Sequence, residues 1–213
     1  MLVSTQLTQH LLRNHALVHI IQVMKKLSAY LFIILFSFQT PSLANDIRDF
    51  QIEGMSIGDS LLDFMDKSEM DFLFLYRDKS FKTTYFDKPK IYDDIQITVK
   101  SDDNNYIIHN ISGKIYYRKN YEECLKDKIE ITKEFQFLIS SKVKTQSEDN
   151  IKRLSDPTGN STWSYYAFYL TDGGVAQVFC TDWSEELLKS KNYVDELKTG
   201  LYSVEFRNFL ANE

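Results

Sequence analysis

Two cysteines, Cys124 and Cys180, are the residues whose chemistry the sequence defines most closely. They are the only cysteines in the chain, and neither belongs to a CxxC motif of the kind used in redox or zinc sites. In an exported protein, a single pair of cysteines most simply forms a disulfide. Because the two are 56 positions apart, the loop-entropy model gives such a bond a stabilising effect of about 4 kcal/mol. The sequence therefore predicts a disulfide between Cys124 and Cys180.

His109 is the only histidine after residue 44, which bears on both metal and catalytic chemistry. A zinc site with several histidines is excluded, and His109 is the single candidate base for a Ser-His-Asp or Cys-His arrangement. The residue lies on a predicted strand and shares one face with Ile107 and Ile111. This position favours a hydrogen-bonded structural imidazole, and a catalytic or pH-sensing role is the alternative.

The other motifs that could carry chemistry are incomplete. The Asp102-Asp103-Asn104 run lacks the glycine and the distal glutamate of an EF-hand calcium loop, so a solvated turn is the better interpretation. Gly173-Gly174 is followed by neither a lysine nor a helix start, so it indicates a turn and not a phosphate loop. We therefore predict no catalytic residues, no metal ligands and no cofactor. The alternative is a small hydrolase whose site is assembled from scattered carboxylates.

The segment from Trp163 to Leu170 is aromatic on both faces of a predicted strand. Alternation places Trp163, Tyr165 and Tyr169 on one face, with Tyr166 and Phe168 on the other. If Asp172-Gly173 forms a two-residue turn, Cys180 lies opposite Tyr165, and Phe179 joins the face of Tyr166 and Phe168. If Gly174 also belongs to the loop, the cross-strand faces are exchanged. The candidate ligand face comprises these aromatic residues: Tyr166, Phe168, Phe179, Trp163, Tyr165 and Tyr169.

Residues 24–44 have the organisation of a secretory signal peptide. Lys25 and Lys26 follow Met24, an apolar run extends over residues 27–38, and Ser42 and Ala44 are the small residues that signal peptidase requires. The run is shorter than the roughly 20 apolar residues of a membrane-spanning helix. We predict cleavage after Ala44 and a periplasmic or secreted protein. Residues 1–23 are interpreted as an upstream overrun of the start site.

Residue 45 is an asparagine and not a cysteine, so no lipid anchor is expected in the mature chain. Residues 1–44 contain three basic and no acidic residues, so removing them changes the net charge from −5 to −8. An acidic surface repels phosphate groups, and this disfavours nucleic acid and anionic membrane surfaces as partners. A protein, a peptide or a glycan remains compatible with the composition.

The elements that would position these residues follow from hydrophobic periodicity and capping. A short helix is expected over residues 56–67, capped by Ser56, and a longer one begins at Asn120 with Glu123 at its third position. The predicted strands cover residues 72–76, 81–86, 91–99, 106–118, 163–171, 175–182 and 194–202. Residues 140–161 are expected to be a polar connection. Short helices complete the pattern at residues 185–189 and 203–210.

This order predicts a single α+β domain over residues 45–213. Antiparallel hairpins would form its sheet and helices would pack on one face. Because a helix precedes hairpins twice, the order also suggests a duplicated helix-plus-hairpin unit. No regular β-α-β alternation is present, so a doubly wound parallel sheet is not expected.

The segment Phe50-Gln51-Ile52-Glu53-Gly54-Met55-Ser56-Ile57-Gly58-Asp59-Ser60-Leu61-Leu62 resembles a family of uncharacterised exported bacterial proteins. The Cys124 helix and the segment Cys180 to Glu186 share this resemblance, which covers most of the mature chain and implies no known activity. The Ile-x-Gly-Met-Ser start is also similar to outer-membrane assembly lipoproteins of the SmpA/OmlA type, although this chain lacks their lipobox cysteine and is longer. The expected function is a non-enzymatic periplasmic binding or accessory module. An envelope-assembly or inhibitor-like interaction protein is a further alternative.

Overall fold

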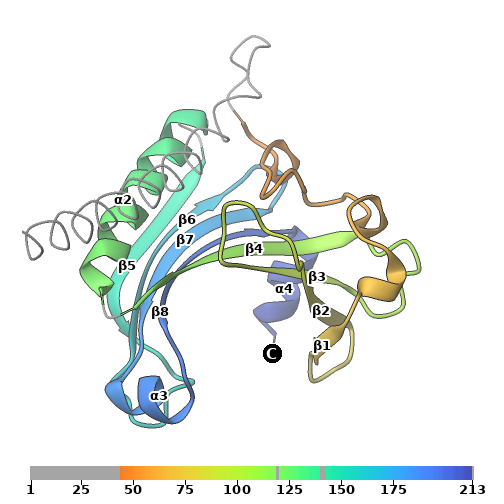
Figure 1. The fold of residues 1–213 in the computed structure, drawn as a ribbon. Helices are drawn as coiled ribbons and strands as arrows, with labels where there is room; N and C mark the ends of the chain where they lie inside the picture. The colour runs from red at the N-terminus through yellow and green to blue at the C-terminus, as the bar shows by residue number, and fades with distance from the viewer. Residues whose placement is uncertain (1–43, 119, 140–142, 213) are drawn as a thin grey trace, which may run out of the picture. The chain divides into compact units, whose positions relative to one another are not determined.

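The computed structural model describes residues 44–118, 120–139 and 143–212, so the predicted signal peptide 24–44 lies outside them except for Ala44. The strands of this part form one antiparallel sheet in the order β1-β2-β3-β4-β8-β7-β6-β5 (Figure 1). Two four-stranded meanders, β1–β4 and β5–β8, therefore meet at the central pair of β4 and β8. The strands are β1 (Phe72–Leu75), β2 (Phe81–Tyr85), β3 (Asp94–Lys100), β4 (Ile108–Tyr117), β5 (Lys144–Lys152), β6 (Thr162–Tyr169), β7 (Val175–Asp182) and β8 (Asp195–Tyr202).

The helices of this part are α2 (Tyr121–Leu138), α3 (Glu185–Ser190) and α4 (Val204–Leu210). Each begins at a side-chain cap, as the sequence predicts for Asn120, whose side chain accepts a hydrogen bond from the Glu123 N–H at 3.3 Å. None of the helices in the described ranges is long and apolar enough to cross a membrane. The mostly antiparallel sheet with added helices is compatible with the predicted α+β class.

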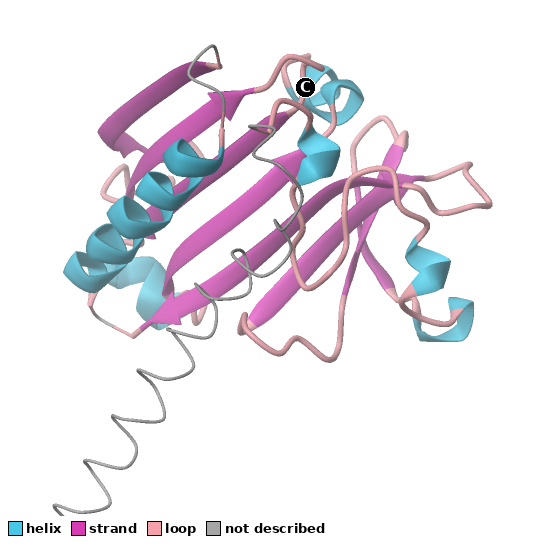
Figure 2. Cartoon of the chain, turned by 90° about the horizontal axis from the view of Figure 1, so that it is seen from above, coloured by secondary structure: helices cyan, strands magenta, loops and turns pink. Residues whose placement is uncertain are grey.

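Helix α2 packs on β7 and β8 and covers part of one face of the sheet, which we call the helix face (Figure 2). Cys180 points to this face, so alternation assigns to it the apolar residues of the core between helix and sheet: Val178, Leu197, Leu201 and Ile111. The segment 44–70 extends this layer, since the Phe50 ring contacts the Phe135 ring of α2 with 5.4 Å between the centroids.

The predicted disulfide is confirmed. Cys124 of α2 and Cys180 of β7 are bonded, with their Cα atoms 6.0 Å apart, and both residues are fully buried. The bond joins the helix to a central strand of the sheet at a distance that disulfide geometry accommodates.

We call the opposite side of the sheet the far face. Helix α4 packs here, because the Phe206 ring contacts Phe81 at 5.0 Å and stacks on Tyr202 at 6.3 Å. Both partners belong to the strand positions that point away from α2. The helices are thus divided between the two faces, with α2 on one and α4 on the other (Figure 1).

The helix predicted over residues 56–67 is not formed, and only the 3-10 turns η2 (Leu61–Asp63) and η3 (Lys67–Glu69) occur there. Gly58 adopts a φ of +93°, which ends any helical run because it lies outside the right-handed region. The Gly58 N–H also donates to Ile108 and the Leu61 N–H donates to Tyr106. The backbone is therefore paired with the start of β4 and not with itself.

Strand β5 lies within residues 140–161, where the sequence predicts only a polar connection. Its sequence, KTQSEDNIK, has no alternation of apolar and polar residues, and eight of its nine residues are exposed. β5 is the edge strand beside β6 and needs few apolar side chains. The prediction failed because backbone pairing alone defines this strand.

A bulge in β4 corrects the predicted face of His109. Thr98 pairs with Asn110 and Val99 pairs with Ile108, so His109 is an extra residue on its strand. Ile108 and Ile111, and not Ile107, are therefore the fully buried residues. The His109 ring contacts Phe81 and its Nδ1 lies 3.1 Å from the Ser203 hydroxyl at the start of α4. Burial lowers the pKa of this imidazole. Through its contacts with Phe81 and Ser203, the His109 ring links α4 to the sheet.

Candidate functional site

Strands β6 and β7 place a cluster of aromatic side chains on the far face. Tyr165 lies directly opposite Phe179, the Trp163 ring stacks on Tyr165 at 5.1 Å, and Trp163 meets Phe179 edge-on at 5.6 Å. Tyr165 and Phe179 are buried, whereas Trp163 and Tyr169 remain half-buried. The cluster thus has a packed centre and two partly accessible edges, which is how aromatic contact surfaces are commonly built.

Strands β3, β4 and β8 continue the far face with charged residues. Lys114 and Glu196 form an ion pair at 3.0 Å, with side chains only 16% and 10% exposed. Lys198 is half-buried beside Phe179, and its ammonium group lies 5.8 Å from the centre of that ring. Its closest hydrogen-bond acceptor is the Gln96 side-chain oxygen at 3.4 Å. Burial and the charge of Lys114 lower the pKa of Lys198 to about 8.

Arg153 follows β5 and places its guanidinium group between two indole rings. The group lies 5.8 Å from the centre of Trp163 and 4.8 Å from that of Trp183. Its Nε is buried without a hydrogen-bond partner, and the described part of the chain provides no carboxylate within ion-pair distance. Burial lowers the pKa of Arg153. Cation–π contacts thus hold in place a guanidinium whose buried Nε–H lacks an acceptor.

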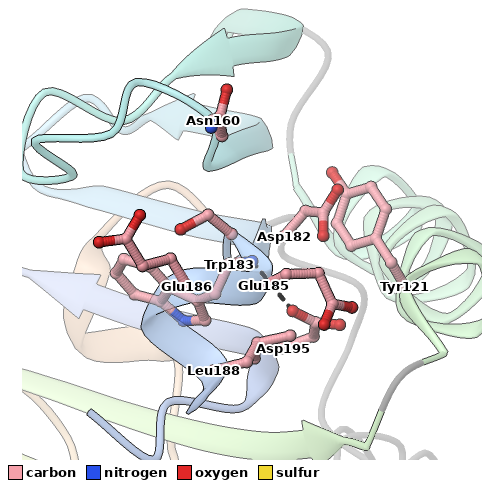
Figure 3. Close-up of a pocket in the computed structure, with 9 residues that line it drawn as sticks. Tyr121, Asn160, Asp182, Trp183, Glu185, Glu186, Leu188 and Asp195 are labelled. Atoms are coloured by element: carbon pink, nitrogen blue, oxygen red, sulfur yellow. Dashed lines mark hydrogen bonds between the residues drawn. The ribbon is translucent and has the colours of Figure 1, made fainter. Parts of the chain in front are cut away.

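A separate pocket of about 640 Å³ lies at the end of β7, beside α3 (Figure 3). Asp182 is the last residue of β7 and Asp195 is the first residue of β8, so each lies one position beyond the pair of Thr181 and Glu196. Both residues belong to the helix face. The Asp195 carboxylate accepts a hydrogen bond from the Trp183 N–H at 2.9 Å, and Asp182 is placed near Tyr121. Burial raises the pKa of both carboxyl groups, and the charge of Asp182 raises that of Asp195 further.

Metal binding gains no support from this acidic pair. Within the described ranges, no three His, Cys, Asp or Glu side chains are grouped so that they could hold a metal ion. What the pair offers is two carboxyl groups whose pKa values are raised by burial, and carboxyl groups of this kind can serve in proton transfer.

The structure divides the six predicted aromatic residues between the two faces. Cys180 pairs with Ser164 and Phe179 pairs with Tyr165, and the Leu170 N–H donates to the Gly174 carbonyl at 2.9 Å. The connection is therefore Thr171-Asp172-Gly173, and neither of the two predicted registers is formed, although the faces are exchanged relative to the two-residue turn. Tyr166 and Phe168 therefore lie under α2, where Phe168 is 1% exposed, while Trp163, Tyr165, Tyr169 and Phe179 share the far face. These four residues are brought together, and the other two are separated from them by the sheet.

Sequence reasoning missed the charged part of the far face. In β8, Glu196 and Lys198 alternate with Leu197 and Leu201, so the strand itself carried the signal of a polar face. Placing that face beside the aromatic cluster requires the strand order and the hairpin register. Arg153 follows an unpredicted strand and had no signal in the sequence.

No protein-family model, no curated protein and no solved structure matches this chain, so its functional assignment rests on the chemistry of its own residues.

Proposed function

We propose that this chain is an exported, non-enzymatic binding module whose ligand site is the far face of the sheet around Trp163, Tyr165, Tyr169 and Phe179. The disulfide supports export, because such bonds persist in oxidising compartments. The signal-like residues 24–44 support it independently. Protein recovered from the periplasm or the medium should begin at Asn45, and an intact chain in the cytoplasm would contradict export.

The observation that carries the binding proposal is the incomplete cover of the far-face aromatics. Helix α4 packs over the end of the face at Tyr202 and Phe81, whereas Trp163 and Tyr169 stay half-buried. Rings held at their centre and accessible at their edges offer a large apolar contact area at a small cost in side-chain entropy. A rigid antiparallel sheet also keeps these rings in place before a ligand arrives, which reduces the ordering cost of binding.

The proposal can be tested with N-phenyl-1-naphthylamine, an uncharged aromatic probe whose emission rises in apolar surroundings. We expect the folded protein to bind it and Trp163→Ser to weaken the binding about 10-fold, since truncating a central aromatic contact typically costs this much or more. Tyr166→Ser is the matched control, because Tyr166 is half-buried on the same strand but faces α2. Equal weakening by the two variants, or no binding to the wild-type protein, would contradict the proposed face.

A second candidate function is hydrolysis at Asp182 and Asp195. The specific observation in its favour is a pair of carboxyl groups with raised pKa values inside one pocket, the arrangement used in general acid–base catalysis (Figure 3). Two further facts weigh against it. Glu185 and Glu186 also line the pocket, and its accumulated negative charge lacks a basic side chain among the lining residues. The aromatic far face is therefore the preferred site.

A further inference from the structure

Three hydrogen-bond donors on the far face lack the acceptor that each would normally have. The Arg153 Nε and the Thr181 hydroxyl are buried without a partner, and Thr181 is fully buried. Lys198 reaches only the neutral Gln96 oxygen at 3.4 Å, and no carboxylate in the described ranges lies within 4.0 Å of its ammonium group. Buried polar groups are rarely left unsatisfied, because each one costs free energy. Such groups occurring together indicate a missing acceptor.

The three donors are neighbours. Phe179 pairs with Lys198 and Thr181 pairs with Glu196, so Thr181 and Lys198 are diagonal partners on adjacent strands. Thr181 also pairs with Trp163, the ring against which the Arg153 guanidinium lies. The positive charge of Arg153 contributes to the lowered pKa of Lys198, as expected for two cations near each other.

The acids on this face do not balance its positive charge. Glu196 is bonded to Lys114 at 3.0 Å, and Asp94, whose pKa is raised by burial, accepts the Tyr116 hydroxyl at 3.1 Å. Glu148 of β5 also belongs to this face, where it lies opposite Tyr165 and accepts its hydroxyl at 3.0 Å, and Lys144 lies opposite Tyr169. Around the aromatic cluster, Lys114, Lys144, Arg153 and Lys198 thus stand against the three carboxyl groups of Asp94, Glu148 and Glu196. This excess occurs on a chain whose net charge is −5. A local surplus of partly buried positive charge on an acidic protein complements an anion.

We infer that the far face binds a small molecule with an aromatic or apolar body and one anionic oxygen group, which is held between Arg153, Thr181 and Lys198. This inference rests on the proposed function and specifies the chemistry of its ligand. The aromatic cluster of Trp163, Tyr165 and Phe179 contacts the body of the molecule. The guanidinium, hydroxyl and ammonium groups then donate to a carboxylate, phosphate or sulfonate, and charge-assisted hydrogen bonds of this kind are the strongest that side chains offer.

The pH dependence follows from the pKa of Lys198, about 8. The ammonium group is charged below this value and loses its proton above it, so affinity for an anion should fall as the pH rises from 7 to 9.5. The groups that face Lys198 are Lys114 of β4, Asp94 of β3, Glu196 of its own strand and Arg153 beyond β5. Arginine keeps its proton throughout this range. A bound anion raises the pKa of Lys198 in the complex, so affinity begins to fall near the pKa of the free protein and continues to fall until the pKa of the complex is passed.

The experiment compares two probes with the same ring system, 8-anilino-1-naphthalenesulfonate and its uncharged counterpart N-phenyl-1-naphthylamine. We expect Lys198→Met and Arg153→Met each to weaken the sulfonate about 10-fold, the usual effect of losing a hydrogen bond to a charged group, and to leave the uncharged probe within about twofold. Lys198→Arg keeps the charge and should retain most of the affinity. Lys144→Met is the matched control, since Lys144 is an exposed lysine of the same face, next to Tyr169.

Each outcome has a distinct meaning once circular dichroism shows that the variants are folded. Equal weakening of both probes, or no change for either, would overturn the anion site while leaving the aromatic face intact. A wild-type protein that binds only the sulfonate, and does so through Lys198, would support the anion site and contradict the apolar face. Sulfonate affinity that stays constant from pH 7 to 9.5 would also overturn the role of Lys198.

Discussion

Removing the disulfide with the double substitution Cys124→Ala and Cys180→Ala should lower the free energy of unfolding by about 4 kcal/mol. The bond closes a loop of 56 residues, and without it the unfolded chain regains the entropy that the loop removes. Alanine leaves no polar group in a site where both cysteines are fully buried. Urea denaturation of the oxidised wild-type and variant proteins measures the difference.

Chemically reduced wild-type protein is the matched control, because it lacks the same bond and keeps both sulfur atoms. Its stability should lie close to that of the double variant or slightly above it. A loss below about 1 kcal/mol in both proteins would show that packing alone holds α2 on the sheet, and would contradict the importance given to the disulfide.

Phe168→Ala should destabilise the fold by about 3–5 kcal/mol, the usual cost of truncating a fully buried phenylalanine. Phe168 is 1% exposed on the helix face, and its ring lies 5.6 Å from Phe135 of α2 and 4.9 Å from Tyr166. The residue is therefore a core residue between helix and sheet and not part of the ligand site. Thermal and urea unfolding of the variant measure the loss.

Tyr169→Ala is the matched control for this prediction. Tyr169 is the next residue along β6, points to the far face and is half-buried, with its hydroxyl donating to Gln146 at 3.0 Å. Because less of its surface is buried, its truncation should cost clearly less than that of Phe168. A larger loss for Tyr169→Ala would contradict the assignment of the two faces.

Most strands and the long helix could be predicted from the sequence because local patterns define them. The alternation around Ile95, Ile97 and Val99 predicted β3, and Asn120 marked the start of α2. The failures have one physical cause, which is that backbone pairing with distant segments overrides local preference. Residues 56–67 pair with the start of β4, and the exposed strand β5 exists only because β6 lies beside it.

The candidate site was partly predictable for the same reason. The alternation within β6 separated Trp163, Tyr165 and Tyr169 from Tyr166 and Phe168 correctly. The face to which Phe179 belongs depended on the length of the loop, because a difference of one residue exchanges the cross-strand faces. The residue that joins Asp172-Gly173 in the loop is Thr171, whereas the sequence suggested Gly174. The neighbourhood of Lys198 and Arg153 depended on strand order and on β5, so no local pattern could reveal it.

The central claim is that the far face binds ligand, and a two-dimensional ¹H–¹⁵N spectrum recorded with and without N-phenyl-1-naphthylamine tests it most directly. The chain has only two tryptophans, Trp163 and Trp183, and both rings contact Arg153. We predict that the Trp163 indole N–H signal shifts together with backbone amides of β6 and β7, while those of α2 stay in place; the Trp183 signal is not diagnostic, because Trp183 also lines the pocket of Asp182 and Asp195. Shifts confined to α2 or to the pocket of Asp182 and Asp195, or no shifts at all, would contradict the account.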